Sequence, residues 1–254
     1  MTKDFTKINK NMHWWVLLLA AICGILTVGL VVYRNGGIFT YYGDYNCQQI
    51  AFYMHAHELV TSGQIGWDWN TDLGVNFIGS YSFYLLFSPF FWLTLPFETS
   101  AVPYLMAPLF VLKFMTCAIT AYFYVARFVK DKRFAVIGGL LYAFSGYCIY
   151  NLFFNHFLDV VAFFPLLLIG LEMLITEEKH GPFAAAVALN AIVNYWFFIG
   201  EVVFTVLYFF IRMTDTSIAN RLKKFFFVAA ESVMGLLVSA VVVLPSILAI
   251  AVRI

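Results

Sequence analysis

The chain has 254 residues, of which 63% are hydrophobic and only 11% are charged. A soluble domain carries about 25% charged residues and must cover its outside with polar groups. The composition therefore excludes an ordinary soluble domain and indicates a membrane protein. The net charge of +1 provides no long-range field that would favour nucleic acid as a partner.

The first apolar segment runs from Trp14 to Tyr33, behind a lysine-bearing stretch at 1–13. About 20 apolar residues are enough to cross the hydrocarbon core of a bilayer. The segment is longer than the apolar region of a signal peptide, and it ends in Val-Val-Tyr-Arg rather than at a small-residue cleavage site. It predicts an uncleaved first span at 14–33, preceded by a cytoplasmic tail at 1–13.

Residues 34–102 form the least membrane-like part of the chain, with several acidic residues and Arg34 as the one basic residue. Within it, the spacing of apolar side chains predicts a helix over 46–62. Gly63 follows directly and suits the left-handed C-cap of that helix. We therefore expect a large polar loop that carries its own helical structure.

Further apolar segments follow this loop and predict six more spans. They lie at about 103–126, 134–150, 160–175, 183–196, 198–212 and 225–245. The stretch 183–212 is long enough for one tilted helix, but Asn194 and Gly200 near its middle favour two helices.

Clusters of Lys and Arg set the orientation, because such loops remain in the cytoplasm. One basic cluster lies at 127–133 and another follows residue 212. Both are therefore expected inside, together with the N-terminus. This arrangement places the loop 34–102 and the C-terminus outside.

An apolar and aromatic segment at 80–97 is interrupted by Ser88-Pro89. If it crossed the bilayer, the basic cluster at 127–133 would face outside, so we expect it to lie along the outer surface or to dip in and return. The predicted fold class is an all-α polytopic membrane protein with about seven transmembrane helices and membrane-surface helices in its outer first loop. We expect a single transmembrane domain, 1–254, whose remaining spans occupy 103–254.

Asp44 is the first candidate for chemistry, in the outer loop directly after Gly43. The glycine lets the backbone turn sharply beside a carboxylate. The carboxylate is placed to act as a general base, but a helix begins just after it, so it is equally suited to be an N-cap. The sequence leaves both interpretations open.

The outer segment 151–159 contains His156 and Asp159, three residues apart and so on one side of a helical start. They are suited to bind a metal, a phosphate or a sugar hydroxyl, or else to form a helix cap beside an interfacial histidine. Lys113 lies within the second span, where an ionisable group marks a functional site by default. It is placed either to contact an anionic phosphate or to snorkel towards the interface.

Trp67, Asp68 and Trp69 combine aromatic faces with a carboxylate, a combination that suits a sugar. Tryptophan is also a routine anchor at the membrane interface, and this second interpretation is the commoner one. The four cysteines include no CxxC pair, so the sequence predicts no zinc site and no disulfide framework. Whether a divalent metal is required as a cofactor stays open.

An ordered set of short motifs resembles the YfhO family of bacterial membrane proteins, which belongs to the glycosyltransferase C superfamily. The matching residues are Gly43-Asp44, Gln48-Gln49, Asp72-Leu73-Gly74-Val75-Asn76-Phe77, Tyr84, Ser88-Pro89-Phe90, Leu141-Tyr142-Ala143-Phe144-Ser145-Gly146-Tyr147, Asp159, Pro165 and Gly170-Leu171-Glu172. No single piece is specific, but the order across the whole chain is fairly specific. Members of the family are typically longer, so we expect this chain to be an N-terminal portion.

The resemblance implies a glycosyltransferase that uses a polyprenyl-phosphate sugar on the outer face of the bacterial plasma membrane. It implies Asp44 as the catalytic carboxylate in the first outer loop. Together with the residues above, we expect a substrate site formed by His156, Asp159, Gln48, Lys113, Trp67 and Asp68. The implied partners are membrane lipids, the lipid-linked sugar and a cell-envelope polymer acceptor such as teichoic acid.

Two other functions compete with this one. A lipid or lipid-sugar transporter would carry charged residues near the midplane of several helices and a repeated architecture. A non-catalytic partner subunit of the envelope machinery would need neither. Sugar release from a lipid-linked donor, measured with the purified protein, separates the first function from the other two.

Overall fold

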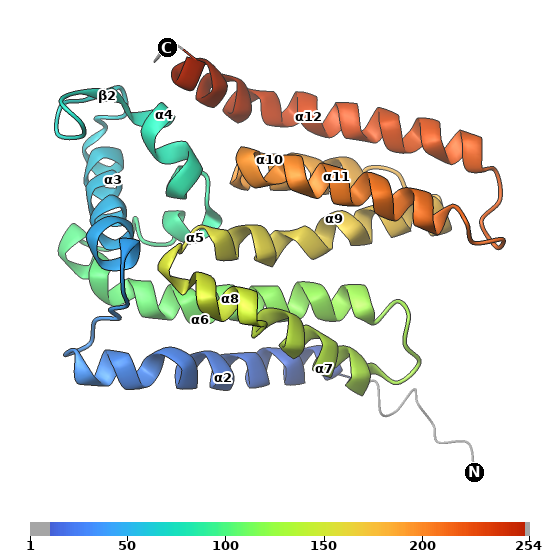
Figure 1. Cartoon of the computed structure of the whole chain (residues 1–254), viewed down its shortest axis with the longest axis horizontal. Helices are drawn as coiled ribbons and strands as arrows, with labels where there is room; N and C mark the ends of the chain where they lie inside the picture. Colours follow the sequence, from blue (N-terminus) through green and yellow to red (C-terminus); the bar gives the residue numbers. More distant parts are fainter. Residues whose placement is uncertain (1–10, 252–254) are drawn as a thin grey trace. The chain divides into compact units, whose positions relative to one another are not determined.

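The computed structural model describes residues 11–251 and is almost entirely helical (Figure 1). The longer helices are α2 (Met12–Arg34), α3 (Ile50–Ser62), α6 (Val102–Val125), α7 (Lys132–Ala143), α9 (Phe157–Glu177), α10 (Pro182–Val193), α11 (Tyr195–Arg212) and α12 (Arg221–Ala251). The short elements are η1 (Tyr45–Gln49), β1 (Trp67–Asp68), β2 (Val75–Asn76), α4 (Phe77–Tyr81), η2 (Ser82–Leu86), α5 (Pro89–Trp92), η3 (Thr99–Ala101), α8 (Gly146–Tyr150) and η4 (Asn151–Phe153). Strands β1 and β2 pair antiparallel, with Trp67 opposite Asn76 and Asp68 opposite Val75.

Six helical segments within residues 11–251 are long and apolar enough to cross a membrane. They are Met12–Arg34, Thr99–Val125, Lys132–Phe153, Phe157–Glu177, Tyr195–Arg212 and Arg221–Ala249. The all-α polytopic fold is therefore confirmed. The seventh segment expected as a span corresponds to α10, whose 12 residues rise about 18 Å and do not by themselves cover the hydrocarbon thickness.

The expected division of 183–212 into two helices is confirmed, and Asn194 is the residue that divides them. Its backbone is extended (φ −157°, ψ 96°), and its side-chain Oδ1 accepts a hydrogen bond from the Phe197 amide at 3.1 Å. Its Nδ2 donates to the carbonyl of Phe83 at 3.1 Å. Asn194 thus ends α10, caps α11 and binds segment 77–87, in the loop between the first two predicted spans.

The broken character expected for 80–97 is also confirmed. The helical turns of α4 and η2 stop at Phe87, and a new helix, α5, starts with Pro89 in its first turn. The apolar helix Phe77–Leu86 is too short to span a bilayer. The helix expected at 46–62 is formed by η1 and α3, and its C-cap is Gly63 at φ +77°.

The chain divides into two compact units. Unit 1 comprises residues up to Gln64 together with Ser88–Ala162, and unit 2 comprises Ile65–Phe87 and Phe163–Ile254. In unit 1, α2, α6 and α7 pack side by side and alternate in direction, so that the basic turn between α6 and α7 lies at the same end as the start of α2 (Figure 1). That end carries the basic cluster at 127–133, one of the two clusters from which the cytoplasmic orientation was predicted.

In unit 2, α10 packs along α12, and Glu231 of α12 caps its beginning. The Glu231 carboxylate accepts hydrogen bonds from the amides of Gly181 at 3.0 Å and Ala184 at 3.1 Å. A carboxylate at a helix N-terminus satisfies amides that have no partner within the helix and complements the helix dipole. The start of α10 is therefore fixed by a residue from the neighbouring helix.

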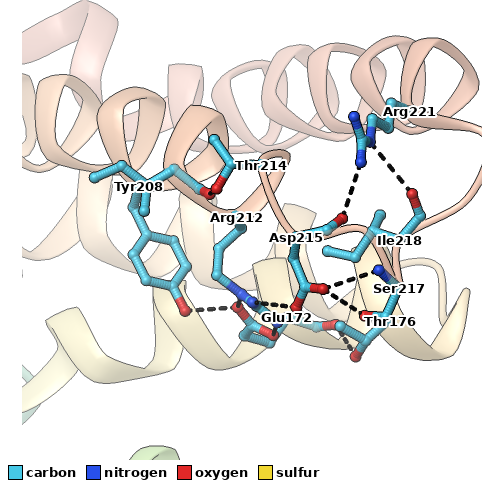
Figure 2. A network of polar contacts seen from close by, with 10 residues as sticks. Glu172, Thr176, Tyr208, Arg212, Thr214, Asp215, Ser217, Ile218 and Arg221 are labelled. Atoms are coloured by element: carbon cyan, nitrogen blue, oxygen red, sulfur yellow. Dashed lines mark hydrogen bonds and ion pairs between the residues drawn. The ribbon is translucent and has the colours of Figure 1, made fainter.

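A second network in unit 2 joins α9 to α11 (Figure 2). Glu172 is buried and accepts hydrogen bonds from Arg212 Nε at 2.6 Å, Arg212 Nη2 at 3.1 Å and the Tyr208 hydroxyl at 2.5 Å. Arg212 Nη1 also reaches Asp215, in the loop after α11, at 3.2 Å. The two-pronged pairing of guanidinium and carboxylate holds the two helices in register.

Candidate functional site

The turn that leads into η1 in unit 1 leaves Asp44 open to solvent. Gly43 takes a left-handed conformation (φ +56°), and Asp44 then precedes η1. The turn is held by Asn46, whose Oδ1 accepts from the Tyr41 amide at 2.9 Å and whose Nδ2 donates to the Tyr41 carbonyl. Asp44 is exposed and makes no side-chain capping hydrogen bond. Its carboxylate is therefore not used as a cap.

The loop that carries Asp44 packs on segment 150–156. The rings of Tyr42 and Phe153 are stacked with centroids 5.2 Å apart. Deeper in, Gln49 Oε1 lies 3.3 Å from Nδ1 of His156. Gln48 is half-buried and accepts from Gln49 Nε2 at 3.1 Å.

Lys113 and Asp159 form a buried ion pair beneath this surface. The Nζ atom lies 2.5 Å from Asp159 Oδ1, and the two side chains are 0% and 2% exposed. Nζ also donates to the carbonyl of Asn155 at 2.9 Å and to its Oδ1 at 2.7 Å. Two hydrogen bonds and an ion pair thus let Lys113 hold segment 155–159 against the middle of α6.

Further polar groups surround the ion pair within unit 1. The Tyr53 hydroxyl faces the side chains of Asn155 and Ser88, and the Lys113 ammonium lies 5.3 Å from the centre of the Phe90 ring. His156 and Asp159 are each 2% exposed, so they lie under the surface rather than on it. We call this set, Gln49, Tyr53, Ser88, Lys113, Asn155, His156 and Asp159, the buried polar cluster.

Trp67 and Asp68, also predicted as substrate-binding residues, belong to unit 2. Asp68 is buried, and its carboxylate accepts from the Asn70 amide at 2.9 Å and the Thr71 hydroxyl at 2.6 Å. It therefore shapes the turn between β1 and β2. Trp67 is 55% exposed and lines a cavity described below.

Sequence reasoning missed Gln49, Tyr53, Ser88 and Asn155 as members of this cluster. The contact between Gln49 and His156 joins residues 107 positions apart, and the contacts of Lys113 with Asn155 join residues 42 positions apart. The available signals were Gln49 and Ser88, which both stand in the motif set. Among residues 11–251, no group of three or more His, Cys, Asp or Glu side chains is arranged to hold a metal ion.

The family model described as bacterial membrane protein YfhO matches residues 16–251 of the chain. No curated protein and no solved structure matches it. The match includes most of α2, the loop with Asp44, all residues of the buried polar cluster and the helices of unit 2. The chain therefore belongs to the YfhO family of bacterial membrane proteins.

Proposed function

We propose that the protein is a membrane glycosyltransferase, acting as a whole or as the N-terminal catalytic part of a longer enzyme. In this proposal it transfers a sugar from a polyprenyl-phosphate donor to a cell-envelope polymer, such as teichoic acid, on the outer face of the bacterial plasma membrane. The N-terminus is cytoplasmic. The observation that carries the proposal is the carboxylate of Asp44, which is exposed and does not cap the following helix. It is held on a turn that packs over the buried polar cluster.

The proposed reaction needs one base. Asp44 takes the proton of an acceptor hydroxyl, and the freed oxygen forms a bond to the anomeric carbon of the donor sugar. The bond from that carbon to the phosphate oxygen breaks, and polyprenyl phosphate leaves with the electron pair. Because the leaving phosphate is already anionic, it needs little protonation, and a second carboxylate acting as acid is not required.

The buried polar cluster positions Asp44 in this proposal. Gln49 contacts His156 at the base of η1, while Lys113 fixes the segment that follows His156. Asp44 stands at the beginning of the same short helix. Because these contacts hold η1 in place, the carboxylate of Asp44 stays in a position from which it can contact an acceptor hydroxyl.

The decisive variant is Asp44→Asn in the full-length protein. It keeps the shape of the side chain and removes its basicity, so sugar transfer from a radiolabelled polyprenyl-phosphate sugar should fall by about 10²–10⁴-fold. Glu58→Gln is the matched control, because Glu58 is another exposed carboxylate of the outer loop, on α3. Near-normal transfer by Asp44→Asn at equal expression would contradict the proposal.

A lipid-sugar transporter is the alternative that one observation favours. Glu201 of α11 is only 7% exposed, and within the described part of the chain neither of its carboxyl oxygens has a hydrogen-bond partner. Buried carboxyl groups at membrane depth occur along transport pathways. A transporter reconstituted in vesicles would move the lipid-linked sugar from one leaflet of the membrane to the other without releasing the sugar. The Asp44→Asn variant would carry out this movement at the normal rate.

A further inference from the structure

Unit 2 contains a cavity of about 450 Å³ beside the small hairpin of β1 and β2. The hairpin side is lined by Trp67, Gly74, Asn76 and Ile78, and the opposite side by the last turns of α12, including Leu248. The volume is within the usual range of small-molecule sites. Neither the reaction proposed above nor the buried polar cluster uses this cavity.

The hairpin fixes the indole of Trp67 at the cavity wall. Gly74 has φ +115°, and a Cβ at this position would lie 2.8 Å from Trp67 Nε1 and 3.0 Å from Cε3 of Trp69. The two indole rings meet edge to face with centroids 5.8 Å apart. Only glycine therefore lets both rings close down on the turn, which presents a rigid aromatic wall.

The turn itself is strained. Asp72 (φ +47°) and Leu73 (φ +67°) precede Gly74 in left-handed conformations that residues with a side chain adopt infrequently. Hydrogen bonds to the Asp68 carboxylate hold the turn in place. Strain of this kind persists where the surroundings impose it and clusters at ligand sites.

Two hydrogen-bond donors of the lining remain available. Among the described residues, neither Trp67 Nε1 nor Asn76 Nδ2 has an acceptor, whereas Asn76 Oδ1 is engaged by the Gly79 amide at 2.9 Å, which orients the amide group. The other lining residues are apolar, and among residues 11–251 no Lys or Arg lines the cavity. Within the described part of the chain, the lining thus offers an aromatic surface and neutral donors.

We infer that this cavity binds a neutral saccharide unit. The apolar face of a pyranose suits the Trp67 ring, and sugar hydroxyl oxygens accept from the two donors. A phosphate group is best bound by a cationic partner, and none of the described residues supplies one to this lining. The inference rests on the proposed function in identifying the saccharide as part of the acceptor polymer, but the binding itself does not depend on transfer.

The test is saturation-transfer NMR on the purified protein in nanodiscs, with methyl glycosides of glucose, galactose and N-acetylglucosamine as probes. At least one glycoside should bind the native chain. Trp67→Ala should weaken that binding at least tenfold, and so should Leu248→Trp, which fills the cavity from the α12 side. Trp196→Ala is the matched control and should leave binding unchanged, because Trp196 of α11 is 63% exposed and does not line the cavity.

The competing outcome is a hairpin that only anchors in lipid. In that case no glycoside binds. The most exposed apolar residues of the hairpin, Leu73 (97%) and Trp69 (75%), then change the depth of the hairpin in the bilayer when they are replaced. Equal binding by Trp67→Ala, in protein with unchanged thermal unfolding, would also overturn the inference. Asp44→Asn should bind the glycoside normally, so failure of saccharide binding and failure of the proposed reaction are seen separately.

Discussion

Lys113 lies in the middle of a membrane-spanning helix, yet its ammonium group is directed entirely at one short segment of the chain. Its three acceptors all come from Asn155 and Asp159. From the sequence we expected contact with a substrate phosphate or snorkelling, since the segment that pairs with it could not be identified. In the structure Lys113 holds segment 155–159 in position. A contact between Lys113 and a substrate phosphate stays a prediction.

Replacement of Lys113 by Met should therefore destabilise the fold strongly. It leaves the Asp159 carboxylate buried without its ion-pair partner, which typically costs about 3–5 kcal/mol. Chemical unfolding in detergent measures the change. Adding Asp159→Leu to Lys113→Met should recover most of the loss, because the unpaired charge is then removed as well.

Lys179→Met is the control for this comparison. Lys179 pairs with Glu177 at 2.8 Å but is 59% exposed. An exposed ion pair contributes roughly 0–1 kcal/mol, so this variant should unfold almost as the native chain does. Similar losses in the two single variants would mean that Lys113 is not a buried structural charge.

His156 gives the fold a pH dependence. Burial, with the positive charge of Lys113 as a second cause, lowers the pKa of His156 to about 3 from its usual value of 6.5. Between these two values the unfolded chain binds a proton that the folded chain does not, so stability is complete above about pH 6.5 and falls as the pH drops towards 3. The slope contributed by one such group is at most about 1.4 kcal/mol per pH unit.

Thermal unfolding between pH 4 and 8 measures this slope. His156→Gln keeps a neutral polar side chain and should flatten the curve below pH 6.5. His13→Gln, at the start of α2 and away from the buried polar cluster, should leave the slope unchanged. A slope that persists in His156→Gln would show that another group controls it.

At the scale of elements, hydrophobic length and local capping chemistry were readable from the sequence. The span expected at 14–33 is α2, and Asn194 divides 183–212 because an Asn side chain caps a helix well. The contacts between elements could not be read in this way. Glu231 appears in the sequence as a charge near a basic loop, whereas it caps α10 from another helix.

Close packing of α10 on α12 depends on Gly235. A Cβ there would lie 2.6 Å from the carbonyl oxygen of Ala184 and 2.6 Å from Cβ of Val187. Gly235→Ala should therefore separate the two helices and lower stability by about 1–3 kcal/mol, the usual cost of overpacking. Thermal unfolding of the purified variant measures the loss.

Gly200→Ala provides the matched control within the same unit. Gly200 lies inside α11, and an added Cβ meets no atom within 4 Å. Alanine in a helix is favoured over glycine by up to about 1 kcal/mol, so this variant should be neutral or stabilised. If Gly200→Ala were as harmful as Gly235→Ala, the contact with α10 would not explain the effect.

At the scale of the whole molecule, the orientation in the membrane is a prediction from charge. Cys47 is exposed in the outer loop, whereas Cys117 and Cys148 are buried. A membrane-impermeant maleimide should therefore label Cys47 in intact cells. In a Cys47→Ala background, Lys130→Cys should stay unlabelled until the membrane is opened, because the 127–133 loop is expected inside; labelling in intact cells would reverse the proposed topology.

The count of crossings shows the limit of reading a whole membrane protein from hydropathy. Alternation of spans and basic loops predicted seven crossings, and six helices reach the required length. The seventh, α10, is short because Asn194 ends it, and its neighbours rather than its length determine its place. Hydropathy reports the apolar character of a segment but not whether protein or lipid surrounds it.

The short α10 has a consequence for the lipid around unit 2. From the charged turn before Pro182, α10 rises about 18 Å, which leaves roughly 12 Å of a 30 Å hydrocarbon layer above Asn194. Asn194 binds the Phe83 carbonyl at the end of α10, so the backbone of segment 77–87 lies directly beyond that helix. With the start of α10 at one edge of the layer, we therefore expect this segment to occupy the remaining depth in the opposite leaflet. The bilayer should then be thinner beside the end of α10 than around the full-length spans.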